Sequence, residues 1–290
     1  LDPQNEDQLV DPAKEAYWGS PDFYIGGAEH AVLHLLYARF WHRFLYDEGV
    51  LKNPEPYRKL FHQGLILGED GNKMSKSVGN VVSPDVVIDA YGADSLRLFE
   101  MFLGPLEAVK PWSEKGIEGV HRFLKKVHRE CLQTEKHLQG EESNKETLKV
   151  LHETILKVTE AIEDLRFNVA ISQMMILINQ LQKVESYSKE SIKTLIQLLA
   201  PFAPHLSEEL WESLGGKPSI ANEPWPQARK ELLVADEITI VFQVNGKLRG
   251  EGQFPKDVDK DSVISAAKAD AKVQSFLEGK EIMKEIYVPS

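Results

Sequence analysis

The sequence is poor in cysteine, in long apolar runs and in positive charge. Its single cysteine, Cys131, excludes an internal disulfide and is typical of a reducing compartment, so we expect a cytoplasmic protein. No window holds about 18 consecutive apolar residues, so neither a membrane span nor a membrane partner is expected. Lys and Arg number 34 against 45 Asp and Glu, for a net charge of −11. A nucleic-acid partner would therefore have to bind local basic stripes rather than a surface that is basic all over.

The chain has the size and composition of a globular protein with more than one domain. Its 290 residues suffice for two or three domains, and 42% hydrophobic and 27% charged residues are ordinary values. The N-terminus lacks an initiator Met and a signal-peptide pattern, and the chain ends directly after an expected strand. We therefore expect a segment of a longer protein.

The first part of the chain indicates an α/β nucleotide-binding unit. After an irregular, acidic lead-in over residues 1–22, a short apolar run over 22–25 reads as a buried strand that ends at Gly26-Gly27. A helical pattern follows from 28 to about 46, and a second strand is expected at 64–68. Strand, glycine turn and helix in this order favour a ligand at the strand ends.

The remainder changes from helical to mixed structure. The helical periods predict segments at about 114–138, 144–165, 168–184 and 188–213, the last broken at prolines, and their short connections indicate an antiparallel bundle. Strands at 238–244 and 247–254 flank Asn245-Gly246, a strong hairpin signal, before a helix at 261–277 and a strand at 282–288.

The predicted fold is thus multidomain. A partial α/β, Rossmann-like half is followed by an all-α bundle and a small α+β domain. The expected boundaries are 1–70 for the α/β half, 71–113 for a lysine-rich loop and the segment after it, 114–233 for the bundle and 234–290 for the last domain.

A loop rich in glycine, lysine and serine spans residues 71–80. Gly and Asn tolerate the positive φ angles of tight turns, so this composition indicates a loop rather than a helix or strand. Lys73 and Lys76 lie three positions apart in it. Two ammonium groups on a loop can close over a polyphosphate and offset the negative charge that builds up on a leaving group. The residues alone leave open the simpler alternative of a solvated basic turn.

A second group of polar side chains follows the first expected strand. Gly26 and Gly27 would let a ligand approach the backbone closely, and Glu29 could accept hydrogen bonds from a ribose. His30 and His34 are four positions apart and would share one helical face. They could be two zinc ligands, two histidines packed in a core, or the wall of a substrate pocket. Because the order is not the zinc-protease pattern and no clear third ligand lies nearby, we predict no structural metal.

These residues, in this order, resemble the class I aminoacyl-tRNA synthetases. Residues 73–77 read Lys-Met-Ser-Lys-Ser, the second signature sequence of that class. Residues 24–40 resemble the corresponding block of bacterial leucyl-tRNA synthetases, whereas valyl and isoleucyl enzymes usually read Gly-aromatic-Asp where this chain has Gly27-Ala28-Glu29. Further similar blocks are 91–97, 202–205 and 244–249, so the resemblance covers essentially the whole chain.

The resemblance implies roles for the two polar groups. Lys73 and Lys76 would bind phosphates, with Lys76 stabilising the transition state as pyrophosphate departs. His30 and His34 would line the leucine pocket. The residues implied to contact ATP or the leucyl adenylate are Gly26, Gly27, Glu29, Gln63, Met74 and Lys76. The expected cofactors are ATP and the Mg²⁺ that accompanies it, and the expected partners are leucine and tRNA(Leu).

The sequence also departs from the family pattern. The first class I signature, of the type His-x-Gly-His, is absent, and residues 68–72 lead into the lysine loop without the leucine-specific insertion of some bacterial members. The first half of the nucleotide fold and the editing domain would precede residue 1. We therefore expect this chain to need the N-terminal catalytic and editing portion of the same enzyme as a partner, and to be inactive alone.

Two basic groups are candidates for tRNA contact. One recurs along a single face of the first bundle helix, where the family places anticodon-stem contacts, although a solvated face is the simpler alternative. It consists of Arg122, Lys125, Lys126 and Arg129. The other is Lys247 and Arg249, just after the hairpin turn, which could reach phosphate in a salt-dependent way.

The resemblance implies that the chain is the C-terminal part of an enzyme of the leucyl-tRNA synthetase family. Two alternatives stay open: a non-catalytic tRNA-binding module that keeps the loop, and a β subunit of a split synthetase. In the latter case the surface near residues 24–44 should be unusually apolar.

Overall fold

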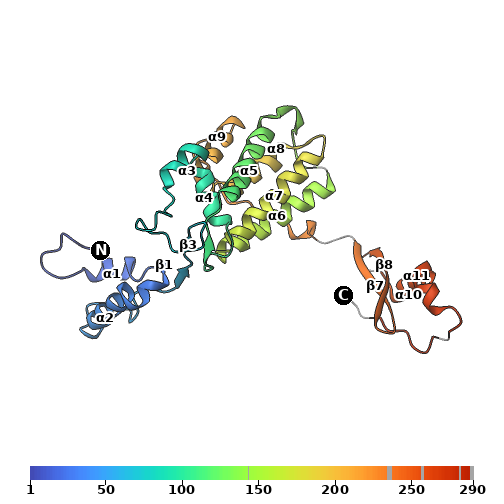
Figure 1. The fold of residues 1–290 in the computed structure, drawn as a ribbon, viewed down its shortest axis with the longest axis horizontal. Coiled ribbons are helices and arrows are strands. Elements are labelled where there is room, and N and C mark those ends of the chain that lie inside the picture. The colour runs from blue at the N-terminus through green and yellow to red at the C-terminus, as the bar shows by residue number, and fades with distance from the viewer. Residues whose placement is uncertain (143, 234–236, 256–257, 281, 288–290) are drawn as a thin grey trace. The chain divides into compact units, whose positions relative to one another are not determined.

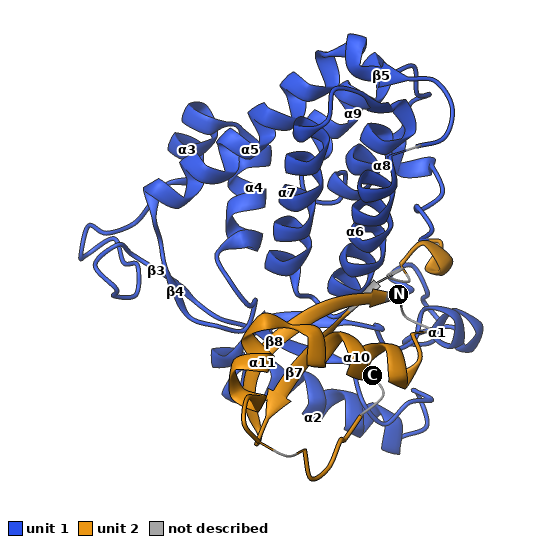
Figure 2. Ribbon diagram, turned by 90° about the vertical axis from the view of Figure 1, so that its right-hand side faces the viewer, with its two compact units in different colours: residues 1–228 blue, residues 229–290 orange. Residues whose placement is uncertain are grey.

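The structure is a computed structural model that describes all residues except 143, 234–236, 256–257, 281 and 288–290. Contacts between residues divide it into two compact units, 1–228 and 229–290 (Figure 2). The described chain is rich in helix, and each of its sheets has two strands. The finer division into four parts stays a prediction.

The first unit begins with a short helix that was not expected. Helix α1 spans Pro12–Trp18 (Figure 1). It begins here because the Asp11 carboxylate accepts hydrogen bonds from the backbone N–H groups of Ala13 and Lys14, and because Pro12 suits the first helical turn. The prediction of an irregular segment over 1–22 was therefore wrong at this helix.

The strand predicted over 22–25 begins two residues later and contains Gly26 and Gly27, and it is not buried as expected, since Ile25 is 48% exposed. It lies in a parallel pair. Strand β1, Tyr24–Gly27, pairs with β2, Leu60–Gln63, so that Gly27 lies opposite Gln63. A 3₁₀ helix at Ala28–Val32 precedes α2, His34–Asp47. The single helix predicted over 28–46 is thus two, because Leu33 has φ −120° and ψ −105°, outside the helical region.

The lysine loop connects a second parallel pair to two helices. Strand β3, Ile66–Leu67, pairs with β4, Lys110–Pro111, and is shorter than the strand predicted over 64–68. Gly64 instead lies against the chain before β4, where a Cβ atom on it would come within 2.1 Å of the Ala108 carbonyl oxygen. Helices α3, Pro84–Tyr91, and α4, Ala93–Phe102, follow the loop.

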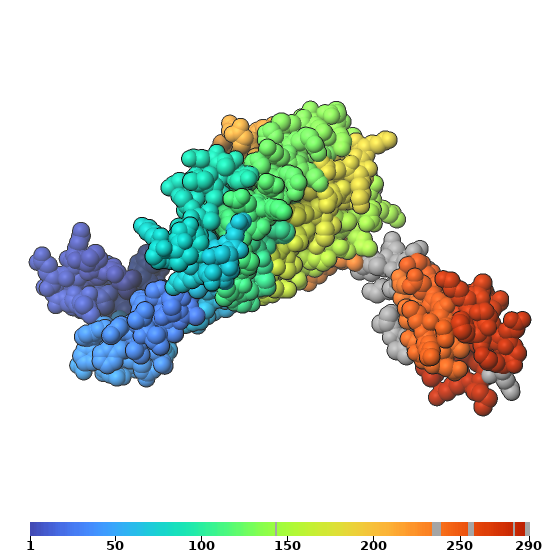
Figure 3. Space-filling model, viewed as in Figure 1, coloured from blue at the N-terminus to red at the C-terminus, as the bar shows by residue number. Residues whose placement is uncertain are grey.

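Five helices form the expected bundle. They are α5 (Glu114–Leu132), α6 (Lys145–Glu163), α7 (Phe167–Lys183), α8 (Lys189–Leu199) and α9 (Pro204–Ser213). Side chains of Ser113, Asn144 and Ser188 cap the first, second and fourth of these, and Pro204 begins the last. Helices α5 to α7 present one continuous surface in the space-filling view (Figure 3). The two-residue strands β5 (His137–Leu138) and β6 (Tyr187–Ser188) pair beside them. The helical periods therefore predicted the bundle helices, but the segment predicted over 114–138 ends as an α-helix at Leu132 and is followed by a 3₁₀ turn and by β5.

The main hydrophobic core joins the bundle to the segment before it. Apolar side chains of α3 and α4 share one buried cluster with those of α5 to α9. Leu98 of α4 is fully buried, and Phe99 contacts Trp112 edge-on at 5.0 Å between ring centroids. The lysine loop is thus attached at both ends to elements of one core.

The second unit is a hairpin covered by two helices. Strands β7, Glu237–Val244, and β8, Lys247–Pro255, are antiparallel, and positive φ angles at Asn245 and Gly246 form the predicted turn. Helices α10, Lys260–Ala269, and α11, Ala271–Leu277, replace the single helix predicted over 261–277, because Asp270 is extended and caps α11. The strand predicted over 282–288 is absent from 282–287, and residue 288 lies outside the described residues.

Over the described residues, no helix is both long and apolar enough to cross a membrane.

Candidate functional site

The lysine loop leaves both of its ammonium groups accessible. Lys73 and Lys76 are exposed, and within the described chain neither forms an ion pair. Lys73 forms a single antiparallel bridge with Leu67 of β3, and Met74 packs against the bundle core. The loop can therefore present two positive charges from an ordered backbone to an anionic ligand.

The glycine-ended strand offers backbone and an adjacent carboxylate. A Cβ atom on Gly27 would lie 2.3 Å from an oxygen of Glu29, so a side chain here would displace this carboxylate from its position against the strand. The Gly26 carbonyl accepts a hydrogen bond from Nδ1 of His62 at 3.1 Å. Gln63 lies beside Gly27, and its Oε1 is buried without a hydrogen-bond partner in the described structure.

His30 and His34 lie close together in a cluster with two tyrosines, but in two successive helices and not on one helical face as predicted. Their rings meet edge-on with centroids 6.2 Å apart. Nε2 of His34 is hydrogen-bonded to the Tyr24 hydroxyl at 2.6 Å and lies 3.4 Å from that of Tyr57. The tyrosine rings stack with centroids 4.0 Å apart. Partial burial raises the pKa of the Tyr57 hydroxyl.

The exposure of the two histidines excludes one alternative. Both are exposed, so the interpretation as core histidines is wrong for this chain. Among the described residues no group of three or more His, Cys, Asp or Glu side chains could hold a metal. The sequence did not identify Tyr57, because only the pairing of β1 with β2 brings it beside Tyr24.

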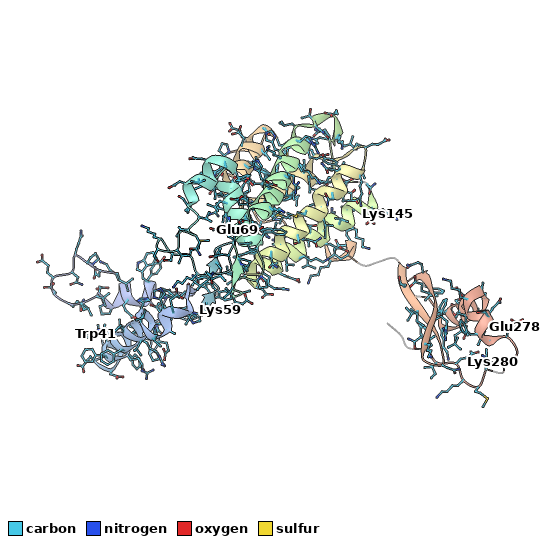
Figure 4. All side chains as sticks on the ribbon, in the orientation of Figure 1. Trp41, Lys59, Glu69, Lys145, Glu278 and Lys280 are labelled. Atoms are coloured by element: carbon cyan, nitrogen blue, oxygen red, sulfur yellow. The ribbon has the colours of Figure 1, made fainter. Side chains whose placement is uncertain are left out.

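A large apolar surface surrounds the histidines on α2 and the turn before it. Seven of its side chains are 46–75% exposed, among them Trp41, which is labelled in Figure 4. This surface, called the α2 face below, consists of Val32, Leu33, Leu36, Tyr37, Phe40, Trp41 and Phe44. Monomeric proteins rarely expose apolar patches of this extent, so the α2 face indicates a covering partner. The expectation of an apolar surface near residues 24–44 is confirmed.

The predicted basic stripe on α5 is accessible at three of its four positions. Arg122, Lys125 and Arg129 are exposed, while Lys126 is half-buried and donates to Oδ1 of Asn179 at 2.8 Å. Burial and the positive charge of Lys125 lower the pKa of His121 on the same helix. The exposed members leave three cations available for phosphate.

The two cations of the second unit differ in their surroundings. Lys247 is exposed at the start of β8. The guanidinium of Arg249 lies over the Phe276 ring, 3.8 Å from its centroid, a cation–π contact that fixes its plane. Its Nε is buried without a partner among the described atoms, so Arg249 is partly structural.

Comparison with known proteins identifies the family. Residues 36–109 match the profile described as tRNA synthetases class I (I, L, M and V), and residues 144–264 match the anticodon-binding domain of tRNA ligase. Proteins named leucine--tRNA ligase from Chlorobaculum tepidum and Chlorobaculum parvum are each 54% identical over 293 aligned residues, which cover the whole chain. The chain belongs to the leucyl-tRNA synthetase family. It spans 36% of the length of these two relatives.

Solved structures agree with membership of the leucyl-tRNA synthetases. The LeuRS of Agrobacterium radiobacter K84, crystallised as a ternary complex with tRNA and LeuAMS, is 35% identical and superimposes with a TM-score of 0.80. The match covers 92% of this chain and 37% of that protein. A methionyl-tRNA synthetase from Mycobacterium tuberculosis, 19% identical with a TM-score of 0.58 over 74% of this chain and 48% of its own, shares the fold.

Proposed function

We propose that this chain forms part of an enzyme that activates leucine with ATP and transfers it to tRNA(Leu). The observation that carries the proposal is the loop that exposes Lys73 and Lys76, neither in an ion pair with any described residue, in a chain of the leucyl-tRNA synthetase family. Because the chain spans about a third of its relatives, the whole reaction would need the N-terminal catalytic and editing portion.

In this proposal the loop lysines act on the phosphates of ATP. Their charges would offset the negative charge that develops as pyrophosphate leaves, and Lys76 would contribute most at the transition state. Mg²⁺ would enter bound to ATP, and Met74 would lie beside the nucleotide. The strand end would take the adenosine part through the backbone of Gly26 and Gly27, with Glu29 at the ribose and Gln63 near the adenine.

The histidine–tyrosine cluster would form one wall of the leucine pocket. His30 and His34 offer flat surfaces and hydrogen-bonding nitrogens. Tyr24, which stacks on Tyr57, orients His34 through a hydrogen bond to its Nε2. Exposure of this wall in the present chain is consistent with a pocket whose other wall comes from the N-terminal portion.

The tRNA would be bound by cations on both units. Arg122, Lys125, Lys126 and Arg129 would contact the anticodon stem, and Lys247 and Arg249 would contact phosphates elsewhere. Removal of one phosphate-binding cation should weaken binding without sequence preference and reduce its salt dependence. The crystallised relative that contains tRNA supports this part of the proposal.

Leucine-dependent ATP–pyrophosphate exchange tests the proposal. It is measured on this chain alone and after addition of a separately expressed N-terminal portion. Exchange only in the mixture is the expected result, and it would also fit a natural split synthetase. If neither sample exchanges while tRNA binding remains and falls with salt, the chain is a non-catalytic tRNA-binding module.

Lys76→Ala should lower the exchange rate in the mixture by about 10²–10³, the usual scale for losing one charge-stabilising group. Lys145→Ala, which removes an exposed lysine at the start of α6 (labelled in Figure 4), is the matched control. A loss of less than about threefold for Lys76→Ala contradicts its assignment.

A further inference from the structure

The side chain of Asn80 joins the two turns of the lysine loop. The first turn bends at Gly68, whose N–H donates to the Asn72 carbonyl at 2.8 Å, and the second bends at Ser75, whose carbonyl accepts from Val78 and Gly79 at 3.1 Å each. Asn80 Oδ1 accepts from the Ser75 N–H at 2.9 Å. Its Nδ2 approaches both carboxylate oxygens of Asp70 at 3.2 Å and the Lys73 carbonyl at 3.4 Å. The carboxamide of Asn80 thus contacts Asp70 in the first turn, Ser75 in the second turn and Lys73 between them.

Asp70 forms the other half of this contact. Besides Asn80, its carboxylate accepts from the backbone N–H of Asn72 at 3.0 Å and from its side chain at 3.2 Å. These hydrogen bonds, the backbone one first, lower the pKa of Asp70. The carboxylate is therefore held by donors of its own loop, although two lysines lie within six positions of it in sequence.

The space for the contact exists because residue 68 is glycine. A Cβ atom there would lie 2.7 Å from Oδ1 of Asp70 and 2.9 Å from Nδ2 of Asn80. Gly68 is itself buried. A side chain at this position would have to displace both partners.

The loop is also attached to the body of the first unit. Met74, between the two lysines, packs against the bundle core. Glu69, labelled in Figure 4, accepts a hydrogen bond from the backbone N–H of Glu114 at the start of α5, at 3.1 Å. Contacts within the loop and contacts with the core thus hold its backbone, while the side chains of Lys73 and Lys76 stay exposed.

We propose that Asp70 and Asn80 are positioning residues that hold Lys73 and Lys76 in one arrangement for the phosphates of ATP. They act through the backbone, since Asn80 bonds to the carbonyl of Lys73 and to the N–H one residue before Lys76. Two like charges three positions apart repel each other and would spread on a loose loop, so fixing their backbone increases the charge that both direct at one ligand. The catalytic consequence rests on the proposed function, whereas the fixing of the loop does not.

Limited trypsin digestion of the 290-residue chain tests the fixing of the loop. Trypsin cleaves after Lys73 and Lys76, and its rate at these two bonds follows local opening of the backbone. Asn80→Ala removes four hydrogen-bond contacts and should accelerate cleavage at both bonds about tenfold, as read by mass spectrometry. Gly68→Ala, which keeps both partners but fills their space, should also accelerate it. Cleavage that is no faster in Asn80→Ala overturns the proposal.

Exchanging Asp70 and Asn80 tests whether faster cleavage comes from loss of their direct contact or from a general loss of structure. Asn80→Asp places one carboxylate against another and should accelerate cleavage most. Combining it with Asp70→Asn restores a donor facing an acceptor, so the double variant should be cleaved at least threefold more slowly than Asn80→Asp. Asp89→Asn is the control, because Asp89 is exposed on α3 without a side-chain hydrogen bond in the described structure. A double variant cleaved as fast as Asn80→Asp contradicts a direct contact.

Pyrophosphate exchange in the mixture with the N-terminal portion tests the catalytic consequence. Asn80→Ala should lower kcat, expressed per folded active site, about tenfold and leave the KM for leucine unchanged. Expressing the rate per active site is needed because loss of folded protein also lowers the apparent kcat without changing KM. Faster cleavage with an unchanged kcat overturns the positioning role. If the unchanged protein gives no exchange, the proposed function fails, and the cleavage rates alone then support or overturn the fixing of the loop.

Discussion

The hydroxyl groups of Tyr24 and Tyr57 meet at one nitrogen of His34. The shorter contact, 2.6 Å from Tyr24, is the stronger hydrogen bond, and Tyr57 contributes mainly by stacking on Tyr24 at 4.0 Å. Tyr57 therefore supports the orientation of His34 without carrying its main hydrogen bond.

Replacement of Tyr57 should affect leucine binding more than ATP binding. If His34 lines the leucine pocket, Tyr57→Ala should raise the KM for leucine about three- to tenfold in the complemented protein, because Tyr24 and His34 lose their support. Tyr57→Phe keeps the stacked ring and should have an effect below about twofold. Equal increases in the KM for leucine and for ATP would contradict a role confined to the pocket.

The local chemistry of most candidate residues could be predicted from the sequence. Lys73 and Lys76 could be identified from the composition of their loop and from their spacing. The rings of His30 and His34 are in contact although a 3₁₀ turn interrupts the expected helix. Tyr57 could not be identified from the sequence, because Tyr24 and His34, which it contacts, lie more than twenty positions away in the chain. The roles of all these residues stay predictions.

Among the helices, α4 is fastened to α9 by one buried carboxylate. Asp94 accepts from the backbone N–H of Leu206 at 2.7 Å and from Nδ1 of His205 at 2.8 Å. Asp94 therefore caps the first turn of α9 although it belongs to α4. The N-cap residue of α9 itself, Ala203, has no side-chain acceptor for this purpose. The segment after the lysine loop and the bundle are joined at this carboxylate.

Loss of this cap should destabilise the first unit. Asp94→Ala should lower the free energy of unfolding by about 1–3 kcal/mol, because the Leu206 N–H in the first turn of α9 loses its acceptor. His205→Ala should cost under about 1 kcal/mol, since the His205 side chain is 76% exposed. Urea unfolding followed by circular dichroism measures both. Equal losses for the two variants would assign the effect to the histidine contact instead of the cap.

Helices and strands could be predicted from the sequence where their apolar periodicity and capping residues are clear. The bundle helices were found because their apolar periods are long and their caps are strong. Strand β2 was missed because its second half, His62-Gln63, is polar and its pairing with β1 spans more than thirty residues. Residues 282–287, where the last strand was expected, pair with no strand in the described unit. Met283 and Ile286 are 90% and 74% exposed there, although Tyr287 packs against the small core.

At the scale of the molecule, the first unit combines a well-packed bundle with an uncovered α2 face. Side chains of α5 to α9 fill one core, whereas no residue of α2 is buried. A helix this apolar gains its stability from a packing partner rather than from helix propensity. We propose that the N-terminal portion of the same enzyme is this partner, in keeping with the proposed function.

A charge placed on the α2 face should therefore prevent association with that portion. Phe40→Asp should reduce complementation of exchange at least tenfold, because a carboxylate would be buried without a partner. It should leave the unfolding midpoint of the chain within about 2 °C, since Phe40 is 64% exposed. Val86→Asp on α3, at a site 68% exposed, is the matched control and should complement normally. Normal exchange by Phe40→Asp, or an equal loss in Val86→Asp, would show that the partner binds elsewhere.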